Sequence, residues 1–467
     1  MFQNNLLMAA ASISTDAAYN VPYSCRFDRA TPSYLTYTPG STGDRRQVTL
    51  SFWQKLSNIG KAQVITFSNI GTSYWQFGNP SVTDTFLDMY SAGSGRFITT
   101  QLFRDPSAWF HIVFSFDTEQ VIGTDRMKMY VNGKIVTDYS TYTALSLDTD
   151  LDFTNTIVQR WGIYGTSASL AADCYLSQVC MIDGLALGPT SFGEFDDNGV
   201  WRPIDITGLT FGTTGYLLDF ADSSALGNDV SGNDNDFTSS GFDANDQMID
   251  TPTKNYCTFT PLSPTGAVVS DGSLSVALTG SSTYDTIGGT ISFPSTGKWY
   301  FEVTCTTLNS VNSNLIGIAE GSTIKTDTSG IDSDTKRRSY RSNDGDLNSD
   351  LAGSVDYGDA YASGDVIGVA VDMDNGALYF RNEGVWQNSG DPTSGASKTG
   401  AAYTDLITSG WTWTPFIHND GTSENIFALN MGQFAYEDTA PTGFKDLNTA
   451  NIPEPTVKNG KKYFDTI

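Results

Sequence analysis

Apolar and polar residues alternate along much of this chain with the two-residue period of a β-strand that is buried on one face. The pattern is clear in Val48–Phe52 and again in Phe110–Phe116. A third apolar run, Val366–Val371, is short and rich in β-branched residues, as a fully buried strand would be. No window shows helical periodicity over more than a few turns. The pattern therefore predicts an all-β fold.

Turn signals separate these strands. Asn132-Gly133 lies between two strand-like runs, 127–131 and 134–137, and predicts a tight hairpin. Asp374-Asn375-Gly376 supplies a second hairpin turn after Val366–Val371. A chain of 467 residues with 45 glycines suggests two or three domains built from short strands. We expect β-sandwiches in tandem.

The first domain is expected over residues 21–185. Three of its segments stand in the order found in concanavalin A-like, laminin G-like jelly rolls: Val48–Trp53, Trp109–Asp117 and Met129–Lys134. The chain resembles that family here, which implies a jelly-roll sandwich.

A second domain is expected over residues 261–440. Five blocks resemble the core of SPRY domains, which are β-sandwich binding modules. They are Gly297–Val303, Leu315–Ala319, Gly364–Gly384, Pro415–Ile417 and Phe427–Gly432. This resemblance favours a recognition protein over an enzyme.

Three further segments complete the predicted organisation. Residues 1–20 form an N-terminal arm without a core of its own, with Phe2, Leu6, Leu7 and Met8 as candidate anchoring residues. Residues 186–260 are rich in turn residues and are expected to pack back on the first sandwich. Residues 441–467 form a tail that contains Pro, Asn and Lys.

An apolar arm followed by two sandwiches resembles the fibre and appendage proteins of tailed bacteriophages, as do Leu218–Asp229 and Pro453–Lys458. The resemblance implies a virion protein that is assembled in the host cytoplasm and exposed on the particle. Its arm would bind other virion proteins, and its sandwiches would bind a host-surface glycan or protein. Appendages are normally symmetric, so a homo-oligomer, with a trimer favoured, is expected. The alternatives are a capsid-decorating or tail-joining protein without receptor binding and a glycan-degrading enzyme.

The charge balance narrows the choice of partners. Asp and Glu number 52 against 26 Lys and Arg, which gives a net charge of −26. Such a surface repels nucleic acid. The cluster Lys336-Arg337-Arg338 with Arg341 is interpreted as a solvated loop. We find no secretion signal at the N-terminus and no stretch long enough to span a membrane.

The cysteines and histidines favour no catalytic or metal chemistry. Five widely spaced cysteines without a Cys-x-x-Cys motif argue against a disulfide framework and a zinc site. His111 and His418 neighbour no recognisable nucleophile, and the structural interpretation is preferred for both.

Glycoside hydrolysis needs two carboxyl groups. The nearest candidates, Glu194 with Asp196 and Asp197, lie between glycines that suit a loop.

Two acidic clusters are candidate calcium sites. Asp148, Asp150 and Asp152 alternate, so a strand would place three carboxylates on one face, where a cation would relieve their repulsion. Asp229, Asp234 and Asp236 form an oxygen-rich turn, although Asp also occurs in turns for backbone reasons alone. Calcium is thus the one cofactor that the sequence suggests, and solvated acidic turns are the alternative.

Ligand recognition by a sandwich uses aromatic side chains on exposed loops. Each such residue is more often part of the core or of a turn than a ligand platform, and these are the two interpretations to be distinguished. The candidates are Tyr74, Trp75 and Phe77 in the first domain and Tyr340, Trp386, Trp411 and Trp413 in the second.

Overall fold

The structure is a computed structural model that describes residues 19–453 except 60–62, 70–72, 80–81, 94, 263–265, 281–284, 310–313, 325–335, 350–352, 420 and 422. The candidate anchoring residues Phe2, Leu6, Leu7 and Met8 lie outside the described residues, as does the tail after Pro453. The described chain divides into two compact units, residues 19–255 and residues 256–453, which we call the first and the second unit.

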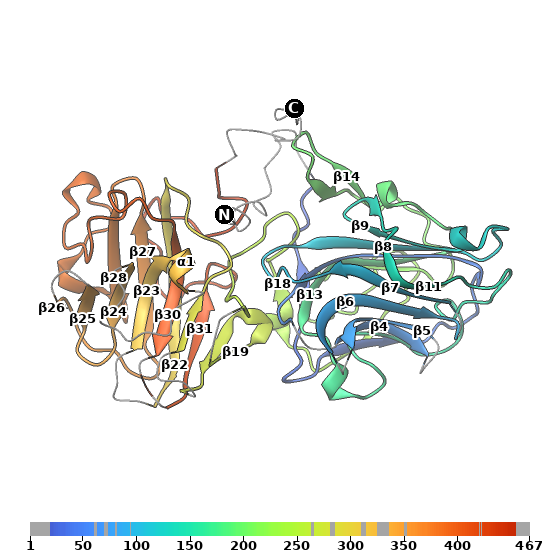
Figure 1. Ribbon diagram of the computed structural model, residues 1–467, viewed down its shortest axis with the longest axis horizontal. Coiled ribbons are helices and arrows are strands. Elements are labelled where there is room, and N and C mark those ends of the chain that lie inside the picture. The colour runs from blue at the N-terminus through green and yellow to red at the C-terminus, as the bar shows by residue number, and fades with distance from the viewer. Residues whose placement is uncertain are drawn as a thin grey trace. The chain divides into compact units, whose positions relative to one another are not determined.

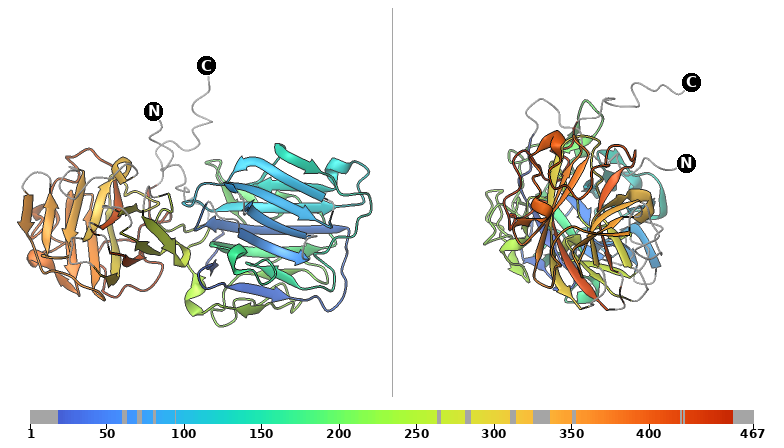
Figure 2. Two further views of the ribbon diagram at one scale, coloured as in Figure 1. Left: turned by 60° about the horizontal axis from the view of Figure 1, so that its bottom comes forward. Right: turned by 90° about the vertical axis from the view of Figure 1, so that its left-hand side faces the viewer.

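Both units are β-sandwiches, and the expected all-β fold with two sandwiches in tandem is confirmed (Figures 1 and 2). Helical structure in the described residues is limited to α1 (Gly321–Ile324) and short 3-10 turns. None of the described helices is both long enough and apolar enough to cross a membrane.

The first unit contains two sheets of eight strands each. One sheet has the order β10-β9-β8-β3-β13-β1-β18, with β16 also paired to β13. Its strands are β1 (Ser24–Phe27), β3 (Gln47–Leu56), β8 (Phe110–Asp117), β9 (Met127–Val131), β10 (Lys134–Ile135), β13 (Cys174–Asp183), β16 (Tyr216–Leu218) and β18 (Gln247–Met248).

The facing sheet has the order β11-β7-β6-β5-β4-β12-β2-β17. Its strands are β2 (Tyr34–Tyr37), β4 (Gln63–Asn69), β5 (Ser73–Asn79), β6 (Val82–Ser91), β7 (Gly95–Leu102), β11 (Tyr139–Thr143), β12 (Gln159–Trp161) and β17 (Thr238–Ser240). A separate two-stranded sheet pairs β14 (Gly193–Phe195) with β15 (Trp201–Pro203).

The core of the first unit lies between its two sheets. Phe52 of β3 packs on Trp75 of β5 with ring centroids 4.4 Å apart, and Trp75 meets Phe114 of β8 at 4.6 Å. The alternation in the sequence therefore marks the face that turns inward.

The outer face of β3, β8 and β13 is buried as well, which the alternation does not predict. Ser51 and Cys180 are fully covered, because residues 186–220 cross this face and build a second apolar cluster. Val113, Phe192 and Leu217 belong to that cluster. The outer face of this sheet is thus buried by a segment that lies more than a hundred positions from β3 in the sequence.

The predicted hairpin at Asn132-Gly133 is present between β9 and β10. Asn132 has φ +46° and Gly133 φ +75°, as a two-residue turn with left-handed backbone requires. A Cβ atom on Gly133 would lie 2.4 Å from the ring of Trp201, so the position also needs glycine for space.

The second unit has sheets of seven and six strands. The larger has the order β19-β20-β31-β22-β27-β28-β29. Its strands are β19 (Ala267–Ser270), β20 (Ser275–Leu278), β22 (Lys298–Leu308), β27 (Val366–Asp372), β28 (Ala377–Asn382), β29 (Val385–Trp386) and β31 (Asn425–Asn430).

The smaller sheet has the order β21-β30-β23-β24-β25-β26. Its strands are β21 (Asp285–Gly288), β23 (Asn314–Glu320), β24 (Arg337–Arg341), β25 (Asp346–Ser349), β26 (Gly353–Asp356) and β30 (Trp413–Asn419).

The outer face of the larger sheet is covered by residues 436–449. The amide of Tyr300 donates to the carbonyl of Lys445 at 3.0 Å, and Leu447 of this segment is fully buried. Part of the expected tail therefore belongs to the second sandwich.

Candidate functional site

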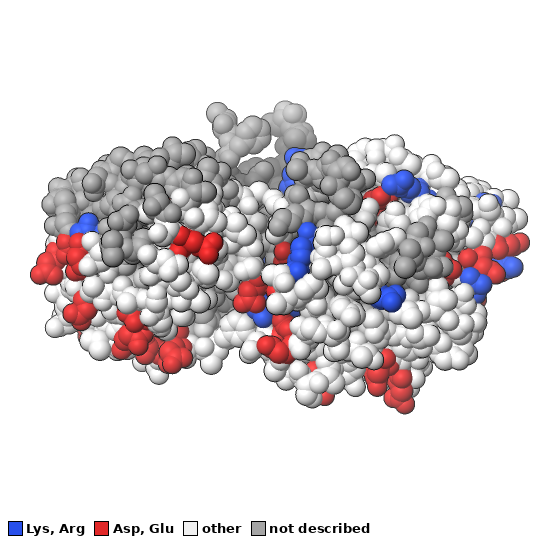
Figure 3. All heavy atoms as spheres, turned by 90° about the horizontal axis from the view of Figure 1, so that it is seen from below, with Lys and Arg blue, Asp and Glu red and all other residues white. Residues whose placement is uncertain are grey.

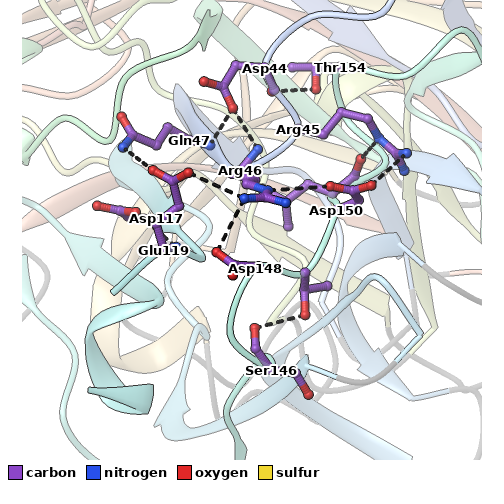
Figure 4. Close-up of polar contacts among 12 residues, drawn as sticks. Asp44, Arg45, Arg46, Gln47, Asp117, Glu119, Ser146, Asp148, Asp150 and Thr154 are labelled. Atoms are coloured by element: carbon purple, nitrogen blue, oxygen red, sulfur yellow. Dashed lines mark hydrogen bonds and ion pairs between the residues drawn. The ribbon is translucent and has the colours of Figure 1, made fainter. Parts of the chain in front are cut away.

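The first candidate calcium site is an ion-paired cluster in the structure, which Figure 4 shows. Arg46 lies 3.3 Å from Asp148 and 3.7 Å from Asp150, measured between side-chain nitrogen and oxygen atoms. Arg45 lies 3.4 Å from Asp150 and 3.6 Å from Asp152. The guanidinium groups occupy the positions next to the carboxylates that a cation would take.

The expected strand over Asp148–Asp152 is not found. These residues form turns, and Asp148 has φ +56°, which is incompatible with a β-strand. The side chains therefore do not share one strand face. Asp152 is buried and accepts a hydrogen bond from the Ser73 hydroxyl at 2.8 Å.

The second acidic cluster is a turn held by its own backbone. The carboxylate of Asp229 accepts hydrogen bonds from the amides of Leu217, Ser231 and Asn235 at 2.8–3.0 Å. Asp236 accepts from the amide of Asp229 at 2.8 Å, and Asp234 is exposed with φ +55°. The backbone explanation for these aspartates accounts for the geometry. Among the described residues, no group of three or more His, Cys, Asp or Glu side chains is placed to hold a metal ion.

The aromatic candidates of the first unit divide between its core and its surface. Trp75 and Phe77 are fully buried, so neither presents the exposed ring that was expected. Tyr74, which points to the other face of β5, is partly exposed. Its ring lies 5.7 Å from that of Tyr90 and 5.8 Å from that of Tyr164. Burial raises the pKa of Tyr74.

His111 stands in a buried polar centre on the outer face of β8. Nδ1 accepts a hydrogen bond from the indole N–H of Trp201 at 3.0 Å, and Nε2 lies 2.9 Å from the Ser51 hydroxyl. Because an indole only donates, Nδ1 carries no proton and Nε2 donates to Ser51. Trp53 stacks on the imidazole with centroids 4.7 Å apart. Burial lowers the pKa of His111 to about 3.

Glu194 lies on the short strand β14, where a loop was expected, and its side chain is exposed. The neighbouring Asp196 accepts hydrogen bonds from the amides of Asn198 and Val200, each at 2.9 Å. Asp196 thus serves the turn that joins β14 to β15.

Two members of the basic cluster, Arg337 and Arg338, are buried on β24, so the interpretation of the cluster as a solvated loop is wrong for them. Arg338 of β24 is 3% exposed and pairs with both carboxylate oxygens of Asp405, at 3.1 and 2.6 Å. Its guanidinium lies within 5.4–5.6 Å of the ring centroids of Tyr403, Trp411 and Trp413. These rings provide cation–π contacts that offset the cost of burying the charge.

Two aromatic candidates therefore meet at Arg338. Trp413 is fully buried and belongs to the core, whereas Trp411 is partly exposed. Trp411 remains a candidate contact residue, and Trp413 is a supporting residue whose indole donates to the carbonyl of Leu406 at 3.0 Å.

Tyr340 and Trp386 also occupy different environments. Tyr340 is fully buried, with its ring stacked 5.4 Å from Phe380 and its hydroxyl donating to the carbonyl of Asp359. Trp386 is partly exposed and covers the guanidinium of Arg381 at 4.9 Å. The exposure expected of Tyr340 is thus not found, because its strand turns it into the sandwich.

A pocket of about 380 Å³ opens on the second unit beside the hairpin that joins β27 to β28. Charged and polar side chains surround it: Lys298, Asp374, Thr393, Thr442, Lys445 and Asn451. Trp299 is also part of the lining, and it is only 1% exposed.

The two lysines of this pocket differ in their contacts and exposure. Lys298 is tied down by an ion pair with the buried Asp372 at 2.9 Å, and its ammonium lies 5.6 Å from the ring centroid of Phe444. Lys445 is exposed. Asp374 accepts a hydrogen bond from the amide of Gly297 at 2.7 Å, which fixes its carboxylate at the rim.

Sequence reasoning missed this pocket, although a signal was present. Lys298 and Asp374 lie inside the blocks Gly297–Val303 and Gly364–Gly384. Lys445 and Asn451 come from the expected tail, and nothing in their local pattern indicates that the tail folds back on β22.

The chain as a whole is acidic, with 52 Asp and Glu against 26 Lys and Arg. On the face drawn in Figure 3, Asp and Glu gather in several separate patches, with fewer Lys and Arg between them. Such acidic patches would repel a negatively charged ligand. An exposed positive charge such as that of Lys445 is therefore a distinctive feature of this surface.

Two parts of the chain match known families. Residues 29–171 match the concanavalin A-like lectin/glucanases superfamily in its laminin G-type form, and residues 298–403 match the SPRY domain. The chain therefore contains one domain of each type, as the sequence motifs indicated. No curated protein matches the chain.

Among solved structures, the chain is similar to the SPRY domain of human HERC1, with 15% identity over 38% of this chain and 99% of that one and a TM-score of 0.30. It is also similar to a candidate carbohydrate-binding protein from Bacteroides ovatus, at 16% identity over 48% of this chain and 59% of that one and a TM-score of 0.33. A pentraxin from Limulus polyphemus shares 15% identity over 36% of this chain and 80% of its own length, with a TM-score of 0.28.

Proposed function

We propose that this chain is a recognition protein without catalytic activity, an appendage of a tailed-bacteriophage virion that binds a host-surface glycan or protein. The pocket of about 380 Å³ on the second unit is the observation that carries the recognition role. A concave site with a few convergent polar groups is the usual form of a ligand site.

The side chains around this pocket suit a hydroxyl-rich or amide-bearing ligand. Asp374 and Asn451 offer acceptors, Lys445 offers a donor, and Thr393 and Thr442 offer both. The backbone around them is held by paired strands, since β22 and β27 are hydrogen-bonded neighbours. Such preorganisation lowers the entropy that binding must overcome.

Two of the residues considered for catalysis, Asp196 and His111, make hydrogen bonds that stabilise the fold. Asp196 holds a turn, and both ring nitrogens of His111 have hydrogen-bond partners. These contacts support a binding role. The alternative enzyme would need two carboxyl groups facing one substrate.

The virion role rests on the sequence. An apolar arm before two sandwiches, together with a net charge of −26, suits a protein that assembles with partners through its N-terminus and exposes the remainder. In this proposal the arm binds capsid or tail proteins, and the chain forms a symmetric oligomer, with a trimer favoured.

The test uses the fluorescently labelled full-length chain and the intact host bacterium. Saturable binding to the host, and its absence with unrelated bacteria, is expected. Replacing Lys445 and Asn451 together by alanine is expected to weaken this binding at least tenfold and to lower the thermal unfolding midpoint of the second unit only slightly, because Nδ2 of Asn451 donates to the carbonyl of Asp446 at 3.0 Å. Lys134→Ala, which removes an exposed lysine from the first unit, is the matched control.

Two outcomes contradict the proposal. If the wild-type chain does not bind the host at micromolar concentration, a capsid-decorating or tail-joining role replaces receptor binding. If the chain shortens purified host capsule or lipopolysaccharide, it is an enzyme. If the double variant binds the host as tightly as the wild-type chain does, the binding site lies outside the pocket.

A further inference from the structure

The first unit buries a lysine, an aspartate and an asparagine in mutual contact. Lys55, on β3, is 1% exposed, Asp250 is fully buried and Asn255 is 5% exposed. The Lys55 ammonium donates to Oδ2 of Asp250 at 2.8 Å and to Oδ1 of Asn255 at 2.7 Å. An amine, a proton acceptor and a carboxamide thus meet at one point inside the protein.

Neighbouring groups hold each member in place. The indole of Trp109 donates to the second oxygen of Asp250, Oδ1, at 2.9 Å. Nδ2 of Asn255 donates to the carbonyl of Ser107 at 2.6 Å, which directs its Oδ1 toward Lys55. The ring of Tyr175 lies 5.9 Å from the ammonium. These contacts leave the three side chains little rotational freedom.

We propose that Lys55 and Asn255 join in an intramolecular amide bond, with Asp250 as the proton carrier. Asp250 first takes a proton from the ammonium, and the neutral amine attacks Cγ of Asn255. A new Nζ–Cγ bond forms, and the Cγ–Nδ2 bond breaks. Of the two protons that Nζ gives up, one completes the departing ammonia through Asp250 and the other leaves with it as ammonium.

This reaction is balanced by the residues present. No bond is oxidised or reduced, and neither a cofactor nor a second substrate is consumed. The products are the cross-link and one ammonium ion, so the reaction needs only the folded chain.

Burial and proximity both favour this step. Transfer of a proton from Lys55 to Asp250 removes two charges from a buried site, where an ion pair is costly to keep. Loss of the proton that faced Asp250 leaves a lone pair on Nζ, and rotation about the Cε–Nζ bond turns it toward Cγ of Asn255, since Nζ already lies 2.7 Å from Oδ1 of Asn255. Reactants held in such a geometry react as if at very high concentration.

The cross-link would change how the first unit resists unfolding. Lys55 and Asn255 are 200 positions apart, so the bond would close almost the whole unit into one loop. A covalent link over a long loop restricts the unfolded chain and so stabilises the fold. Asn255 is also the last residue of the unit, where a pulling force along the chain would enter.

Intact-mass spectrometry of the purified full-length chain tests the proposal. The expected mass is that of the sequence less one ammonia. Because trypsin does not cleave after an acylated lysine, digestion should release residues 47–61 joined to residues 255–298. Asn255→Ala keeps the ion pair between Lys55 and Asp250 and is expected to show its full mass.

A second source of ammonia loss is controlled in the same experiment. A succinimide at Asn132-Gly133 would lose ammonia too, but it would persist in Asn255→Ala and would yield no joined peptide. Asn255→Asp is expected to form the bond with loss of water. A wild-type chain that keeps its full mass after prolonged incubation, with separate Lys55 and Asn255 peptides, overturns the proposal.

Discussion

The indole N–H of Trp201 donates to Nδ1 of His111 at 3.0 Å, and this contact fixes which ring nitrogen of the histidine carries the proton. Trp201 reaches His111 from β15, a strand of the segment that covers the outer face of the first sandwich. The same indole lies over Gly133, where a side chain would collide with it. His111, which was considered for catalysis in the sequence, therefore helps to hold this segment on the sandwich.

Replacing Trp201 by phenylalanine is expected to lower the free energy of unfolding of the first unit by about 1–3 kcal/mol, because Nδ1 of His111 loses its donor while it stays buried. Denaturant unfolding of the full chain measures the change. Phe195→Leu is the control, since Phe195 is 47% exposed and contacts the same indole without a hydrogen bond. An equal loss in both variants would show that ring packing, and not the hydrogen bond, is what matters.

Both histidines are expected to make folding sensitive to acid. Burial lowers the pKa of His111 and of His418 from 6.5 to about 3. Between these values the unfolded chain binds a proton that the folded chain does not, so acid favours unfolding. As the pH is lowered through this range, the free energy of unfolding should fall by about 1.4 kcal/mol per pH unit for each histidine.

The measurement is the unfolding midpoint of each unit between pH 7 and pH 4, with His111→Gln as the comparison for the first unit. The variant should show the smaller dependence on pH. Protonation of His111 near pH 6.5 in the folded chain, seen by NMR, would be inconsistent with its burial.

Arg338→Met is expected to destabilise the second unit by about 2 kcal/mol. The variant leaves Asp405 without its bidentate partner and the three surrounding rings without their cation. The loss stays below that of a fully buried pair, because the Asp405 side chain is 38% exposed and can be solvated. Tryptophan fluorescence should report it, since Trp411 and Trp413 contact the guanidinium.

Lys398→Met serves as the comparison for that variant, because it removes a partly exposed cation from the same region. The hydrogen bond from Arg338 is the largest cause that lowers the pKa of Asp405, and the charge of Lys398 lowers it less, so this pKa should rise more in Arg338→Met than in Lys398→Met. A pKa that does not change would contradict the pairing.

Millimolar calcium is expected to leave the unfolding midpoint of the wild-type first unit unchanged. The guanidinium groups of Arg45 and Arg46 already neutralise Asp148, Asp150 and Asp152, so a cation would have to displace them. In a double variant with glutamine at both arginines, the carboxylates repel one another and calcium should raise the midpoint. A saturable rise in the wild-type chain, reversed by chelation, would instead support the site suggested by the sequence.

The sequence alone determined the fold class and the local turns. Alternation in Val48–Phe52 and Phe110–Phe116 specifies strands, because a pleated backbone places every second side chain on one face. Asn132-Gly133 specifies a hairpin, since these residues tolerate the left-handed backbone that the turn needs. The two domain types were recognisable for the same reason: their motifs are contiguous in the chain.

The tertiary structure decided which of the chemically notable residues are available for function. Arg338 looks solvated in its run of basic residues, yet residues more than sixty positions away enclose it. Trp75 and Trp413 are buried on β5 and β30, whereas Tyr74, on the other face of β5, and Trp411, which precedes β30, are partly exposed. Lys55 meets Asn255 across 200 positions because β3 and the end of the first unit are neighbours in the folded chain. Contacts of this kind depend on the path of the whole chain, which no local pattern encodes.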